Sequence, residues 1–103
     1  MLDLDRIVGF EWDSGNRGKN IRHDVSDGEA EQVFFSSPLL VLEDLRHSGR
    51  ETRYHALGVT LDGRRLHVTF TLRDTGRRIR VISARDMHRK ERAIYEAKAK
   101  ENP

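Results

Sequence analysis

The 103-residue sequence contains no cysteine, and it has no long apolar run. The absence of cysteine excludes disulfides, a thiol nucleophile and any zinc site built on cysteine. No apolar stretch approaches the length of a membrane span, and the first ten residues, MLDLDRIVGF, lack the basic and apolar regions of a signal peptide. The sequence therefore predicts a cytoplasmic protein that makes no contact with a membrane.

Several common cofactor and active-site motifs are also missing. The sequence has no P-loop, no G-x-G-x-x-G after a strand, no H-E-x-x-H and no G-x-S-x-G. Its five histidines do not share a helical metal-ligand spacing. We therefore expect no metal site and no cofactor. The length allows one domain, spanning residues 1–103, with a modest core.

Charge is distributed unevenly along the chain, although the formal net charge is only +2. Residues 1–45 carry four basic and ten acidic side chains, whereas residues 46–92 carry thirteen basic and five acidic ones. Twelve of those thirteen are arginine, whose planar fork binds phosphate through two hydrogen bonds. The basic half favours a polyanionic partner, and the alternative is a general compositional bias towards arginine.

The stretch 66–91 is the clearest structural signal. Apolar Leu66, Val68, Phe70 and Leu72 alternate with polar residues, which is the pattern of a half-buried strand. The sequence Asp-Thr-Gly at 74–76 predicts a turn into a second strand. The polar face of this hairpin then carries His67, Thr69, Thr71, Arg73 and Arg80. An arginine and hydroxyl surface suits phosphate, and the alternative is an ordinary solvated sheet face.

The rest of the chain alternates between strand and helix patterns. Ser26 and Glu29 have the spacing of a capping box, a reciprocal pair of hydrogen bonds at a helix start. Ser83 or Asp86 is expected to cap a C-terminal helix to about Ala99, with a frayed tail over 98–103. The other expected elements are a strand at 7–12, short helices at 16–23 and 27–35, and strands at 39–44, 52–60, 65–72 and 78–83. This order predicts an α+β fold: an N-terminal strand, two short helices, an antiparallel sheet of about four to five strands, and a C-terminal helix.

Arginine beside histidine, glutamate and hydroxyl groups suits cleavage of RNA without a metal ion. That reaction needs a base for the 2′-hydroxyl proton, an acid for the leaving oxygen and cations for the charge developing on phosphorus. Arg85 is expected at a strand-to-helix junction, where a helix N-terminus adds positive potential. For each histidine the alternative is an exposed or cross-strand paired side chain, and for Glu91 an ion pair one helical turn away. The candidate cations are Arg73, Arg80 and Arg85, and the candidate proton carriers are His47, His67 and Glu91.

The motifs of residues 8–96, taken in order, resemble the BrnT family of toxins. The resemblance rests on Phe10-Glu11-Trp12-Asp13, Asn20, Val25-Ser26, Glu29-Ala30, Val33-Phe34, Asp44 with His47-Ser48, Glu51, Arg53, Gly58, Gly63-Arg64, Phe70-Thr71, Arg73, Ile79-Arg80, Ile82-Ser83-Ala84-Arg85, Glu91-Arg92 and Tyr95-Glu96. It implies a RelE-like fold and a ribonuclease toxin of a type II toxin–antitoxin pair. It also implies a ribbon-helix-helix antitoxin similar to BrnA, and binding of operator DNA only through that antitoxin.

The chain departs from this pattern near residue 22, where the family commonly carries Lys-His-Gly and this sequence has Arg22-His23-Asp24. A lysine common in the family aligns near Asn16. If either family lysine contributes to substrate binding in relatives, this chain must use Arg22 or Lys19 instead, or be weaker. The alternative function is a non-catalytic nucleic-acid-binding or co-repressor subunit that acts with a DNA-binding partner. The further residues expected to bind RNA are Arg53, Arg78, Arg89, Arg92, Lys19 and Arg22.

Overall fold

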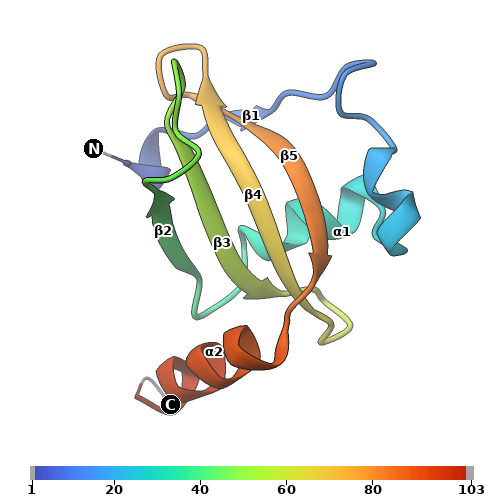
Figure 1. Cartoon of the computed structure of the whole chain (residues 1–103), viewed down its shortest axis with the longest axis vertical. Coiled ribbons are helices and arrows are strands. Elements are labelled where there is room, and N and C mark those ends of the chain that lie inside the picture. Colours follow the sequence, from blue (N-terminus) through green and yellow to red (C-terminus); the bar gives the residue numbers. More distant parts are fainter. Residues whose placement is uncertain (1, 102–103) are drawn as a thin grey trace.

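A mixed five-stranded sheet forms the centre of the computed structural model, which describes residues 2–101 (Figure 1). The spatial order is β1-β5-β4-β3-β2, with β1 parallel to β5 and every other neighbouring pair antiparallel. The predicted α+β class is therefore confirmed. The strands are β1 (Gly9–Phe10), β2 (Leu40–Asp44), β3 (Arg53–Val59), β4 (Arg65–Arg73) and β5 (Arg78–Asp86), and the helices are α1 (Asp27–Val33), α2 (Arg89–Glu101) and the 3-10 helices η1 (Leu4–Arg6) and η2 (Lys19–His23).

The core lies between the sheet and α1, which passes behind β3, β4 and β5 in Figure 1. Leu66, Val68 and Phe70 of β4 are fully buried there, as the alternating pattern predicts. The Phe70 ring packs edge-on against Phe34 and stacks on Tyr54, with ring centroids 4.9 and 5.3 Å apart. The opposite face of the sheet is left for the polar side chains, and α2 leaves the sheet at its lower end (Figure 1).

Local sequence signals account for most of the element boundaries. The Ser26 hydroxyl accepts from the Glu29 N–H at 3.1 Å, and the Glu29 carboxylate accepts from the Ser26 N–H at 3.0 Å. The predicted capping box is therefore confirmed. Gly63 and Gly76 have φ angles of 84° and 85° in the two hairpin turns, a backbone region that costs glycine little.

Four expected boundaries are wrong. β5 continues through Ser83 to Asp86, so neither residue caps the C-terminal helix, and Arg85 lies inside a strand rather than at a helix N-terminus. The segment 16–23 is helical only from Lys19, as a 3-10 turn, and the strand expected at 7–12 is reduced to two residues. The C-terminal helix continues to Glu101, so residues 98–101 are helical rather than frayed, and 102–103 lie outside the described residues.

A β-bulge in β5 decides which side chains share a face. Thr69 pairs with Ser83 and Phe70 pairs with Val81, so Ile82 is an extra residue between them. Val81 and Ala84 both point into the core as a result. Strict alternation from Arg80 would have turned Arg85 towards the core, because successive strand residues face opposite sides. The bulge places Arg85 opposite His67, on the same face as Arg80.

The polar face of β4 is less open than the sequence pattern suggests. His67, Thr69 and Thr71 are only 8%, 9% and 3% exposed. His67 is covered by Glu91 of α2 and by the His55 ring, and Thr71 donates to the Thr52 carbonyl at 2.8 Å. The expectation of an exposed hydroxyl surface on this strand is therefore wrong, since β4 is central and its neighbours close over it.

Candidate functional site

An arginine-rich cavity of about 340 Å³ lies on the sheet face opposite α1. Four arginines and one glutamate line it, which leaves an excess of positive charge. The loop between β2 and β3 closes one side, and β4 and β5 form the base. The lining residues are His47, Gly49, Arg50, Glu51, Arg53, Thr71, Arg73, Arg80 and Ile82. The structure thus brings together four predicted site residues, His47, Arg53, Arg73 and Arg80.

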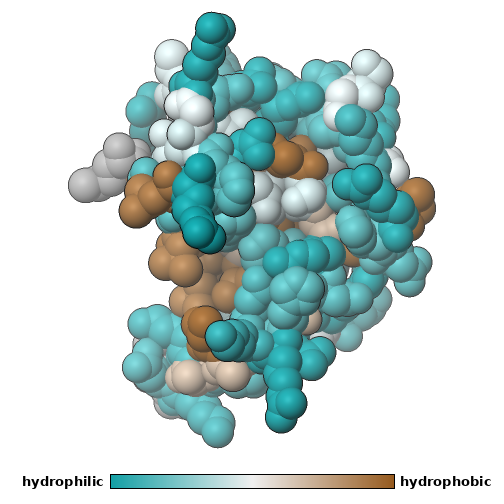
Figure 2. All heavy atoms as spheres, in the orientation of Figure 1, coloured by the Kyte–Doolittle hydropathy of each residue, from teal (hydrophilic) through white to brown (hydrophobic). Residues whose placement is uncertain are grey.

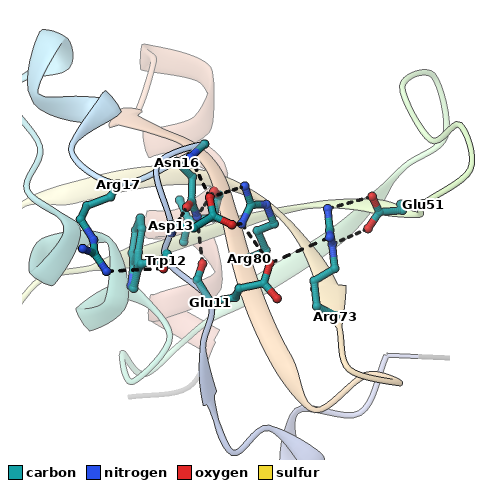
Figure 3. Close-up of polar contacts among 10 residues, drawn as sticks. Glu11, Trp12, Asp13, Asn16, Arg17, Glu51, Arg73 and Arg80 are labelled. Carbon is teal, nitrogen blue, oxygen red and sulfur yellow. Dashed lines mark hydrogen bonds and ion pairs between the residues drawn. The ribbon is translucent and has the colours of Figure 1, made fainter.

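The two arginines at the centre of the cavity, Arg73 and Arg80, are already paired with carboxylates (Figure 3). Arg80 donates to Glu11 and Asp13 at 2.9 to 3.0 Å, and its pKa is raised, chiefly by the hydrogen bonds that it donates to Asp13. Arg73 donates from Nη2 to one Glu51 oxygen at 3.0 Å, and its Nε lies 2.7 Å from the other oxygen. An arginine fork that fits a carboxylate in this way also fits a phosphate.

Two buried asparagines bring the acidic segment 11–13 onto β5. Asn16 donates to the carbonyls of Glu11 and Val81 at 2.9 and 3.0 Å, and it accepts from the Asp13 N–H (Figure 3). The Asn20 side-chain oxygen accepts from the Ala84 N–H at 2.8 Å. The acidic half of the sequence therefore covers part of the basic half within this chain.

Asp44, at the end of β2, holds two histidines beside the cavity. Its side chain is 7% exposed, and its Oδ2 lies 3.0 Å from Nδ1 of His47 and 2.9 Å from Nε2 of His55. Burial opposes ionisation of Asp44, but the hydrogen bonds from His47 and Arg46 outweigh it and lower its pKa to about 2. Nδ1 of His55 lies 3.1 Å from the Thr69 hydroxyl. Asp44 is therefore an ionised carboxylate at any pH near neutrality.

A second cluster on the same face contains Arg85, Glu91 and His67. Arg85 donates to both Glu91 oxygens at 2.8 and 3.1 Å, and Glu91 also accepts from the His88 N–H at the start of α2. Burial opposes ionisation of Glu91, but these partners outweigh it and lower its pKa to about 2. A carboxylate this acidic is a weak base near neutral pH. The geometry favours a structural role for Glu91 in joining α2 to β5.

His67 is held in its neutral form by its surroundings. Burial is the main cause, and the Arg85 charge adds to it, so the pKa of His67 falls to about 4. The Glu91 carboxylate, 3.8 Å away, acts in the opposite direction but does not outweigh them. Because the unfolded chain binds this proton near pH 6.5, stability from His67 is fully present above pH 6.5. It is lost as the pH falls towards 4.

We expect this loss to reach about 3 kcal/mol of unfolding free energy between pH 6.5 and 4. Urea denaturation at several pH values measures it, with His67→Gln as the comparison, since glutamine does not titrate. The variant should lose less stability than the wild type across this window. Equal pH dependence in both proteins would contradict the assignment. The difference between the two proteins isolates His67, because carboxylates with lowered pKa values, such as Asp44 and Glu91, lose their contributions in both proteins as the pH falls below about 4.5.

The other basic residues predicted to bind RNA lie outside the cavity. Arg78 is exposed at the start of β5 near Asp74, and Arg89 and Arg92 are exposed on α2. Lys19 and Arg22 are exposed on η2, which packs against β5.

Sequence reasoning missed Asp44, His55, Arg50 and Glu51 as members of the site. The Asp-x-x-His spacing of 44 and 47 was a usable signal, because a side chain at the end of a strand often caps the following turn. No such signal exists for His55, which reaches Asp44 only through the pairing of β2 with β3.

Apolar side chains also reach the surface on this face. Figure 2 shows them along the β2 side of the view, above α2. Leu42, Leu45 and Ile94 are 64%, 81% and 55% exposed.

Within residues 2–101, no helix is long and apolar enough to cross a membrane, and no three histidine, aspartate or glutamate side chains are arranged to hold a metal ion.

The fold and the cavity together define a small α+β protein that presents arginine and histidine to a phosphate-sized space. The chain belongs to the BrnT family, since the family model, described as the ribonuclease toxin BrnT of a type II toxin–antitoxin system, matches residues 12–91. The resemblance drawn from the sequence is therefore confirmed. The protein is an endoribonuclease toxin whose substrate is RNA and whose partner is an antitoxin. A search of curated proteins finds no match to this chain.

Proposed function

We propose that this toxin cleaves RNA without a metal ion, at the arginine-rich cavity. The scissile phosphate enters between Arg73 and Arg80, and His47 exchanges a proton with the ribose. Arg53 and Arg50 contact the flanking phosphates. The proposal is supported above all by the convergence of four arginines and a histidine on one cavity, since side chains there can supply both the charge and the base that the reaction needs.

Entry of RNA requires the arginines to exchange carboxylate partners for phosphate. Glu51 lies on the exposed loop, with 47% of its side chain accessible, and an exposed ion pair of this kind contributes only about 0–1 kcal/mol. A phosphodiester can therefore displace Glu51 from Arg73 at modest cost. The Arg80 side chain is 16% exposed and pairs with two carboxylates. Its main role is therefore to stabilise the floor of the cavity.

We further propose that loss of RNA inhibits translation in the cytoplasm. A ribbon-helix-helix antitoxin similar to BrnA then neutralises the toxin, and the complex meets operator DNA only through that antitoxin. The arginine surface supports RNA binding that weakens steeply with salt, because phosphate contacts release counterions. The second cluster, with Arg85, His67 and Glu91, extends the basic face towards Arg89 and Arg92 on α2.

Induced expression of the chain alone, and together with the antitoxin, tests the proposal. We expect growth arrest with loss of intact RNA on a gel, reversed by the antitoxin. Cleavage by the purified toxin should persist in EDTA. Normal growth with intact RNA, from protein shown to be folded, would instead support the non-catalytic co-repressor. Complete loss of cleavage in EDTA would contradict the metal-free mechanism.

A further inference from the structure

We propose that Asp44 is the positioning residue for cleavage, because it fixes His47 in the tautomer that leaves Nε2 free to take the 2′-hydroxyl proton of RNA. This inference rests on the proposed function of His47 as the proton carrier. It assigns a role to a carboxylate that never touches the substrate, and it explains why a buried charge lies beside an otherwise cationic cavity.

The Asp44 carboxylate is the acceptor in four hydrogen bonds. The backbone N–H groups of Arg46 and His47 each donate to Oδ1 at 3.1 Å. The His47 and His55 rings approach Oδ2 at 3.0 and 2.9 Å. The backbone pair folds the loop after β2 into a tight turn, which places the His47 ring against the same carboxylate.

The charge of Asp44 determines both histidine tautomers. An ionised carboxylate only accepts hydrogen bonds, so each ring nitrogen that faces it must carry a proton. His47 therefore carries its proton on Nδ1, and a neutral ring then has its lone pair on Nε2. Among residues 2–101, no group is bonded to that Nε2, and the side chain is 69% exposed at the cavity edge.

His55 is excluded from proton transfer by the same reasoning. Its Nε2 donates to Asp44, so its Nδ1 is an acceptor, and the Thr69 hydroxyl lies 3.1 Å from it. Both ring nitrogens are thus engaged within the protein. His55 contacts the far side of Asp44, and its ring packs at a tilt against the His67 ring, with ring centroids 4.8 Å apart. Of the two histidines on Asp44, only His47 has a nitrogen available to RNA.

The resulting step is balanced without any further group in the protein. The 2′-oxygen gives its proton to Nε2 of His47 and bonds to phosphorus, the bond from phosphorus to the 5′-oxygen breaks, and that oxygen takes a proton from water in the open cavity. The products are a 2′,3′-cyclic phosphate end and a 5′-hydroxyl end. Asp44 stabilises the imidazolium that forms, as a buried aspartate does in serine proteases.

Asp44→Asn tests the assignment, because asparagine keeps the shape of the side chain and removes its charge. We expect RNA cleavage to fall about 10³-fold or more, by analogy with the wrong-tautomer variant of a serine protease. Nitrogen-15 spectra of the histidine rings should show His47 protonated on Nδ1 in the wild type and on Nε2 in the variant. His47→Ala identifies the His47 signals and should itself cleave RNA at least as slowly as Asp44→Asn, at a residual rate that can still be measured.

A double-mutant cycle separates positioning from a general structural role. If Asp44 acts through His47, Asp44→Asn should add little further loss in the His47→Ala background. A structural defect would lower activity in both backgrounds, and that result would overturn the inference. So would an unchanged His47 tautomer in Asp44→Asn. If Asp44→Asn does not fold, Asp44→Ser replaces it, because serine keeps an acceptor for the backbone N–H groups of the turn. The same results are then expected, and the same results would overturn the inference.

Failure of the inference can be told apart from failure of the proposed function. Full activity of Asp44→Asn, with strongly reduced activity of His47→Ala, would overturn only the role of Asp44. Full activity of His47→Ala would overturn both this inference and the proton carrier on which it rests. His23→Ala is the matched control, since His23 is exposed on η2 and does not line the cavity.

Discussion

Replacing Arg73 with alanine is expected to lower RNA cleavage by about 10²–10³-fold, the usual cost of losing one donor to a developing negative charge. Arg73 lies at the end of β4, and its guanidinium lines the cavity. The fold should survive, because the side chain is 39% exposed and its ion pairs are at the surface. Initial rates of RNA cleavage and thermal unfolding of the same samples measure both effects.

Three companion variants sharpen this test. Arg73→Lys keeps the charge but loses the fork that holds two oxygens at once, so it should recover only part of the activity. Glu51→Gln frees Arg73 from its carboxylate partner, so RNA should bind more tightly. Arg77→Ala, an exposed arginine outside the cavity, is the control. Wild-type cleavage by Arg73→Ala would remove Arg73 from the site.

Replacing Phe70 with alanine is expected to cost about 3–5 kcal/mol of unfolding free energy, the range for deleting a fully buried aromatic ring. Phe70 has no exposed surface and contacts the rings of Phe34 and Tyr54. A domain of this size has only about 5–15 kcal/mol in total. The folded population should therefore be small at growth temperature, and toxicity should be lost with it. Urea denaturation of the purified protein measures the loss.

The chain provides a control of the same residue type. Phe35 is 80% exposed, so Phe35→Ala should change stability by less than about 0.5 kcal/mol. A similar loss from both substitutions would mean that the core is not centred on Phe70.

Arg85 and Glu91 are two site candidates whose contact with each other the sequence did not predict. Arg85 was expected at a helix N-terminus, and the alternative to a site role for Glu91 was an ion pair one helical turn away. The structure joins them to each other across six residues, from β5 to α2. The bulge at Ile82 decides this outcome. A bulge depends on how two strands match in length and twist, so a single strand pattern does not reveal it.

The acidic N-terminal half is a second feature whose contacts the sequence did not predict. The sequence shows its negative charge, but not the arginine with which that charge pairs. Glu11 and Asp13 reach Arg80 because β1 pairs with β5, the Glu11 N–H donates to the Ile79 carbonyl, and Asn16 ties the same segment to Val81, 65 residues away in the sequence. Contacts at such separations depend on the complete chain path. The excess of positive charge in the basic half is therefore smaller at the protein surface than composition suggests.

The α+β class, the β4–β5 hairpin and the capping box of α1 could be predicted from the sequence, because they rest on local physics, namely alternation of side chains along a strand, hydrogen bonds between neighbours, and the backbone freedom of glycine. The BrnT family followed from the resemblance of its motifs, taken in order. The folded structure was needed to show that Asp44 lies between His47 and His55, and that Arg50, Arg53, Arg73 and Arg80 share one cavity. Strand register brought these groups together, and register is set by the whole sheet and the face it buries.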